Sequence, residues 1–122
     1  MTSSNAVPQC DVLYADIRRR DGERPAVLLD VREPDEVRDV RTDGALHLPF
    51  SGIAGQLDHI PRDRPVLVMC AAGNRSAAVA AHLLANGWTD VANVAGGINA
   101  WERAGLPVRR GPYGPDERDP FA

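Results

Sequence analysis

Cys70 is the residue of this sequence best placed to do chemistry. It follows an apolar run, Val66 to Met69, that predicts a buried strand, and a helical pattern begins at about Ser76. The sulfur would therefore lie at the carboxyl edge of a sheet, facing the amino end of a helix. Backbone N–H groups and the helix dipole at such a place favour a thiolate over a thiol. The pattern predicts a nucleophilic cysteine with a lowered pKa.

The loop after this cysteine consists mostly of small residues, so the backbone can approach the sulfur closely. Gly73 also permits a positive φ. Arg75 could bind the carbonyl groups of the loop or face an anionic ligand, and the sequence leaves both roles open. The competing interpretation is a buried structural cysteine, which the strand–loop–helix context disfavours. We expect the substrate-binding loop to comprise Ala71, Ala72, Gly73, Asn74, Arg75 and Ser76.

Composition limits the possible chemistry. The chain has 122 residues and a net charge of -3, which fits one domain with no electrostatic footprint for nucleic acid or a membrane surface. All 14 basic residues are arginine, so no lysine can act as a nucleophile or form a Schiff base. Cys10 and Cys70 show no metal-ligand spacing, and we expect free thiols. The three histidines show no spacing that suggests a catalytic pair with Cys70. With no secretory signal and no apolar run of membrane-spanning length, the expected location is the cytoplasm.

The elements that must position Cys70 alternate along the chain. Strands are predicted at 26–31, 46–48, 65–69 and 91–94, and helices at 11–20, from 34, at 53–60, 76–86 and 98–104. This alternation predicts an α/β domain with a mainly parallel sheet, in which ligands bind at the carboxyl ends of the strands. We expect the domain to cover residues 6–108. Residues 109–122, rich in proline and glycine, are predicted to form a flexible tail, and residues 1–5 to be loose.

Three segments resemble the rhodanese-like domain family. Cys70–Ser76 is similar to its C-x-x-G-x-R-S loop, Leu28–Glu33 followed by Glu36 to its "DVRE…E" stretch, and Val94–Val108 to its "GG…W…GLPV" signature. The resemblance implies a three-layer fold with a mainly parallel central sheet and helices on both faces. It also implies a sulfurtransferase that carries a sulfane sulfur as a Cys70 persulfide and needs no metal or organic cofactor. The implied donor is thiosulfate or a persulfide, and the acceptor is a thiol or cyanide; a protein could serve as donor or acceptor.

Two further predictions concern residues around the loop. Asp30 and Arg32 end a predicted strand near the loop, and we expect them to support it rather than to touch the substrate. Many family members carry a basic or polar residue directly after the cysteine, whereas this chain has Ala71. We therefore expect thiosulfate to be a poorer donor than a persulfide.

Three other functions share features with this sequence. Cysteine-dependent phosphatases and arsenate reductases share this fold class but use a longer C-x5-R loop, whereas Cys70 and Arg75 form C-x4-R. Rhodanese-like domains also serve as regulatory docking modules, although these often lose the cysteine. A non-enzymatic persulfide carrier or sensor would have the same sequence features as the enzyme.

Overall fold

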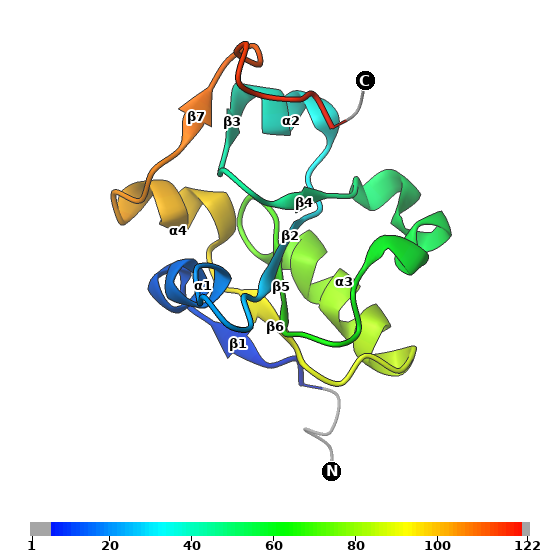
Figure 1. Cartoon of the computed structure of the whole chain (residues 1–122). Helices are drawn as coiled ribbons and strands as arrows, with labels where there is room; N and C mark the ends of the chain where they lie inside the picture. Colours follow the sequence, from blue (N-terminus) through cyan, green and yellow to red (C-terminus); the bar gives the residue numbers. More distant parts are fainter. Residues whose placement is uncertain (1–5, 121–122) are drawn as a thin grey trace.

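A five-stranded parallel sheet forms the centre of the molecule. The computed structural model describes residues 6–120, so the prediction for residues 1–5 lies outside the described part. The strands stand in the order β1-β6-β5-β2-β4 (Figure 1), and every neighbouring pair is parallel. Their bounds are Gln9–Cys10 (β1), Val27–Asp30 (β2), Leu46–His47 (β4), Val66–Met69 (β5) and Val91–Val94 (β6).

Helices cover both faces of this sheet, as predicted. Helices α1 (Val12–Arg19) and α4 (Gly97–Arg103) pack on one face around Trp101, which is fully buried. Helix α3 (Asn74–Ala85) lies on the opposite face, where Val79 and Leu83 join a second apolar cluster. Within residues 6–120, no helix has the length and apolar character needed to cross a membrane.

The sheet's side chains alternate between the two clusters. In β5, Val66 and Val68 pack towards α3, whereas Leu67 and Met69 pack towards α1 and α4. Cys70 continues this alternation and joins the α3 side. The period-2 geometry of a strand thus directs the sulfur towards the helix that begins a few residues later.

Local structure differs from the prediction in two places. Helix α3 begins at Asn74, two residues earlier than expected, because Gly73 adopts a left-handed conformation (φ 111°) and turns the chain directly into the helix. The short helix expected at 53–60 is instead two 3-10 helices, Phe50–Gly55 and Leu57–His59. Helix α2 (Pro34–Asp39) begins as expected at Pro34, with the Glu33 N–H donating to the Glu36 carboxylate at 2.9 Å.

Residues 109–120, in the segment predicted to be a flexible tail, make specific contacts with the domain. Strand β7 (Arg109–Arg110) pairs antiparallel with β3 (Val40–Arg41), beside α2 in Figure 1. Arg41 is 2% exposed and binds both carboxylate oxygens of Glu117, at 2.7 and 2.9 Å. Its guanidinium also stacks on the Tyr113 ring. Local composition could not indicate this contact, because Arg41 lies 76 positions from Glu117 in the sequence.

This attachment makes stability depend on Glu117 and on pH. Hydrogen bonds from Arg41 lower the pKa of Glu117 to about 2. A lowered carboxyl pKa stabilises the fold above the unfolded-state pKa, and that contribution is lost as the pH falls towards about 2. We expect Glu117→Gln to lower the free energy of unfolding at pH 7, and its difference from wild type to shrink in acid. Urea titrations across this range measure it, with Asp116→Asn, an exposed neighbour, as the control; equal effects of the two variants would contradict the prediction.

Candidate active site

The Cys70 sulfur lies at the carboxyl end of β5, in the first turn of the loop that leads to α3. The residue is 1% exposed. Its sulfur accepts hydrogen bonds from the Gly73 N–H at 3.1 Å and from the Ser76 hydroxyl at 3.2 Å. Burial raises the pKa of Cys70. The Ser76 hydroxyl and the backbone N–H groups of Ser76, Gly73 and Ala72 outweigh burial, so the pKa lies below that of an ordinary cysteine. The structure thus brings Ala72, Gly73 and Ser76 of the predicted loop to the sulfur.

The loop can turn its N–H groups inward because its carbonyl groups are bound on the other side. The N–H groups of Ile98 and Asn99, in the first turn of α4, donate to the carbonyls of Cys70 at 2.9 Å and of Ala71 at 3.1 Å. Gly97 enters this helix with a φ of 53°. A Cβ there would lie 2.2 Å from the Cys70 carbonyl oxygen. The Gly96–Gly97 turn is therefore a place of close backbone approach beside the Cys70 loop.

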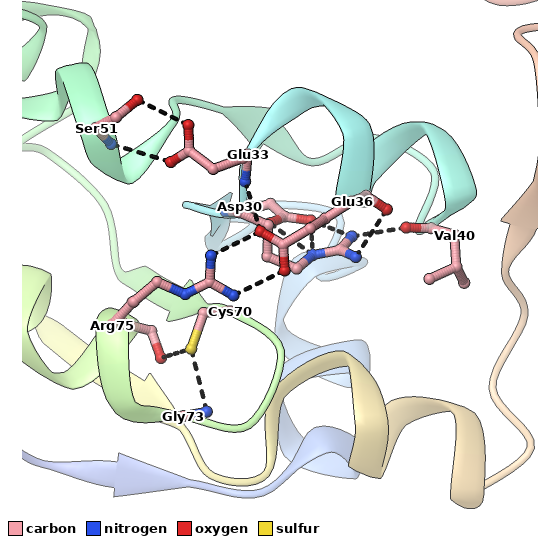
Figure 2. Close-up of polar contacts among 10 residues, drawn as sticks. Asp30, Glu33, Glu36, Val40, Ser51, Cys70, Gly73 and Arg75 are labelled. Carbon is pink, nitrogen blue, oxygen red and sulfur yellow. Dashed lines mark hydrogen bonds and ion pairs between the residues drawn. The ribbon is translucent and has the colours of Figure 1, made fainter.

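Arg75 takes neither of the roles left open by the sequence. Its guanidinium binds the Glu36 carboxylate of α2 with two hydrogen bonds, at 2.6 and 2.8 Å. Figure 2 shows this pair reaching across above the Cys70 loop. The pairing lowers the pKa of Glu36 to about 2 and raises that of Arg75. Glu36 thus occupies two guanidinium nitrogens and joins the loop to α2, while Arg75 also interacts with the Cys70 sulfur, which contributes to its raised pKa.

Asp30 and Arg32 form a buried ion pair at the end of β2. Arg32 donates to both Asp30 oxygens and to the carbonyls of Glu36 and Val40, at 3.2 and 2.8 Å. Both residues are at most 1% exposed. Through Arg32, they bind carbonyl groups at the carboxyl end of α2, the helix that carries Glu36. Their link to the Cys70 loop thus runs through α2, and their predicted supporting role remains a prediction.

The other side chains of the predicted loop, and two further titratable groups, differ in burial. Ala72 and Asn74 expose their side chains, and Ala71 is half-buried against the cluster on the α4 side. Cys10 is half-buried in β1, where burial and the neighbouring Asp11 raise its pKa to about 11. His47 lies 3.8 Å from the Asp30 carboxylate, and burial lowers its pKa.

Sequence reasoning missed three parts of the site. Glu36 carried a signal in the family-like acidic stretch, but nothing in the sequence showed that Arg75 was its partner. The N–H donors of Ile98 and Asn99 are backbone groups and leave no signal except the adjacent glycines. Asn93 of β6 donates to the Gly73 carbonyl at 3.2 Å and lies 2.5 Å from the Ser76 hydroxyl oxygen. A buried asparagine in an apolar strand was its only signal.

Comparison with known proteins gives consistent matches. The sequence model of the rhodanese-like domain matches residues 13–104. A thiosulfate sulfurtransferase GlpE from Actinobacillus succinogenes is 41% identical over 83 residues, which cover 68% of this chain and 75% of that protein. A rhodanese-related protein from Thermoplasma volcanium superposes with a TM-score of 0.65 at 33% identity, over 80% of this chain and 90% of that one. A Rhodopseudomonas palustris protein, described as a possible tyrosine phosphatase, gives 0.76 at 25% identity over 88% of each chain.

Proposed function

This chain is a sulfurtransferase of the rhodanese-like domain family, and from this premise we propose that it transfers a sulfane sulfur through a persulfide on Cys70. The observation that carries the proposal is the set of donors around the sulfur. Gly73 and Ser76 donate to it directly, and the loop carbonyls are bound to α4. A thiolate in such surroundings is stabilised without a neighbouring general base.

The chemistry has two balanced steps. The Cys70 thiolate attacks the outer sulfur of thiosulfate; the S–S bond of the donor breaks with its electron pair, and sulfite leaves. The enzyme then holds Cys70–S–S⁻. Cyanide or an acceptor thiolate attacks the terminal sulfur, leaves as thiocyanate or a persulfide, and regenerates the Cys70 thiolate. A glutathione persulfide donor would follow the same route, with the glutathione thiolate as the leaving group.

The Arg75–Glu36 pair supports sulfur transfer over phosphoryl transfer. A phosphatase needs the arginine of its loop to hold an oxyanion. Here two guanidinium nitrogens of Arg75 bind Glu36, and the loop is one residue shorter than C-x5-R. The alternative that remains is a persulfide carrier or sensor, which would accept the sulfur but turn over slowly. Because Cys10 and Cys70 are both free, the reducing cytoplasm is the location we propose.

Mass spectrometry combined with an assay of thiocyanate formation tests this proposal. Protein incubated with thiosulfate or with glutathione persulfide should gain the mass of one sulfur atom on Cys70, and cyanide should remove it as thiocyanate. Multiple turnovers support an enzyme. A single turnover would support the carrier, and no mass gain with either donor would refute the proposal.

The occupied fork of Arg75 also gives a prediction about the donor. We expect wild type to use glutathione persulfide better than thiosulfate, because Glu36 neutralises the arginine of the loop. Glu36→Gln keeps an acceptor for the Glu33 N–H but removes the charge, so it should lower the KM for thiosulfate by roughly three- to tenfold. Steady-state kinetics with both donors measure this. Asp35→Asn, a charge removal on the exposed side of the same helix, is the control; a KM that is unchanged in Glu36→Gln would contradict the prediction.

A further inference from the structure

Ser76 has one hydroxyl hydrogen and two acceptors within reach. Its oxygen lies 3.2 Å from the Cys70 sulfur and 2.5 Å from Oδ1 of Asn93. Ser76 is fully buried, and Asn93 is 3% exposed, so water does not compete for these groups. A hydroxyl can give its single hydrogen to only one of the two acceptors at a time.

The orientation of the Asn93 amide is fixed by its other partners. Its nitrogen donates to the Gly73 carbonyl at 3.2 Å and to Oε1 of Gln9 at 2.9 Å. A backbone carbonyl can only accept, so the amide nitrogen must face Gly73. Oδ1 therefore faces Ser76 and can only accept from it. Asn93 thus holds the loop at Gly73 and draws the Ser76 hydrogen away from the sulfur.

We propose that Asn93 is a positioning residue that takes the Ser76 hydrogen whenever Cys70 Sγ is uncharged and yields it when Sγ becomes a thiolate. The proposal rests on the proposed function. In the persulfide the negative charge resides on the outer sulfur, and Sγ no longer needs the hydroxyl donor. The Ser76 hydroxyl therefore turns towards Asn93 when the sulfur is loaded and back towards Sγ when it is delivered.

Competition from Asn93 also keeps the thiolate reactive. The intrinsic nucleophilicity of a thiolate falls as its pKa falls, and the best attacking thiol has a pKa near the ambient pH. Removing the Asn93 carbonyl takes away the partner that the Ser76 hydroxyl has while Cys70 is a thiol, which disfavours the thiol form and lowers the pKa of Cys70. Loss of the contact with Gly73 is a separate effect, because it changes the loop and does not involve the Ser76 hydrogen.

The charged groups around the loop affect the pKa of Cys70 equally whether residue 76 is serine or alanine. Arg75 of α3 is paired with Glu36 of α2 and also interacts with Cys70, and Asp30 at the end of β2 is paired with Arg32. Helix α4 faces the loop with backbone N–H groups. These contributions are common to all variants below and cancel in their comparison.

A double-mutant cycle tests the proposal. The pKa of Cys70 is measured from ultraviolet thiolate absorbance and from the pH dependence of alkylation by iodoacetamide, in wild type, Ser76→Ala, Asn93→Ala and the double variant. Asn93→Ala should lower the pKa of Cys70 in the wild-type background. The drop should be larger, by roughly one unit, than the change that Asn93→Ala causes in the Ser76→Ala background. Equal shifts, or a difference of opposite sign, would overturn the proposal. Asn86→Ala, which removes an exposed amide side chain at the carboxyl end of α3, should leave the pKa unchanged.

A second measurement avoids variants of Asn93, whose replacement also removes the contact with the Gly73 carbonyl. The side-chain ¹⁵N and ¹H resonances of Asn93 are followed by NMR through the titration of Cys70. They should shift in wild type with the midpoint of Cys70 and shift less in Ser76→Ala, where only the charge of the sulfur acts. Equal shifts in the two proteins would overturn the proposal. Neither measurement involves turnover, so a failure to transfer sulfur would refute the proposed function alone.

Discussion

Replacing Cys70 by serine is expected to lower the rate of thiocyanate formation by at least about a thousandfold. The serine hydroxyl fits the same position at the end of β5. Its pKa is far too high for the loop donors to produce an alkoxide at neutral pH, and oxygen cannot carry the sulfane sulfur as a persulfide. The fold should persist, at a cost of about 1–2 kcal/mol for a polar group in the 1% exposed site. Circular dichroism checks the fold, and the cyanide assay measures the rate.

Cys10→Ser is the matched control for this prediction. Cys10 is half-buried, and its pKa is raised to about 11, so it is almost entirely a thiol at neutral pH. We expect its replacement to leave the rate within about twofold of wild type. Mass gain that persists in Cys70→Ser and disappears in Cys10→Ser would assign the sulfur to the wrong cysteine and contradict the proposed mechanism.

Gly97→Ala is expected to have the second largest effect, on both stability and rate. The added Cβ would lie 2.2 Å from the Cys70 carbonyl oxygen and 2.7 Å from that of Ala71. Relief requires α4 to move away from the loop, which breaks the hydrogen bonds that Ile98 and Asn99 donate to these carbonyls. Two lost hydrogen bonds and a left-handed alanine together should cost about 3 kcal/mol or more. Urea denaturation measures this cost, and the rate should fall at least about tenfold because the N–H groups of the loop no longer converge on the sulfur.

Gly105→Ala is the control that introduces backbone strain without the steric clash expected in Gly97→Ala. Gly105 also has a positive φ, 75°, but a Cβ there meets nothing within 4 Å. It should cost about 1 kcal/mol and leave the rate unchanged. If Gly97→Ala proves no more damaging than Gly105→Ala, then the contact between α4 and the loop does not support the site.

Much of the fold follows from patterns that are local in the sequence. Val66 to Met69 read as a buried strand because it is apolar on both faces, and the structure buries all four residues. The helix predicted at 11–20 begins where its N-cap lies, since the Asp11 carboxylate accepts from the Tyr14 N–H at 2.8 Å. The strand–Cys70–loop–helix arrangement could be predicted for the same reason, because the residues that create it are neighbours in the chain.

Contacts between distant residues account for what could not be predicted. The sequence allowed Arg75 to bind the loop carbonyls or to face an anion, and only the packing of α2 brings it to Glu36. The sequence indicated that Gly73 could adopt a positive φ. It did not show that Asn93, 20 positions away, would donate to the Gly73 carbonyl. Strands β1, β3 and β7 are two residues long, which is too short for a hydropathy pattern.

The parallel order of the sheet also has a consequence for the synthesis of the protein. Strand β1 pairs with β6, and Gln9 contacts Asn93 across 84 positions. Such pairing gives a high contact order and favours slow folding. A nascent chain that has emerged only as far as α3 contains Cys70 but lacks β6 and the α4 donors. We expect its thiol to react much like an ordinary cysteine until β6 and α4, which lie in the last third of the chain, dock against the loop.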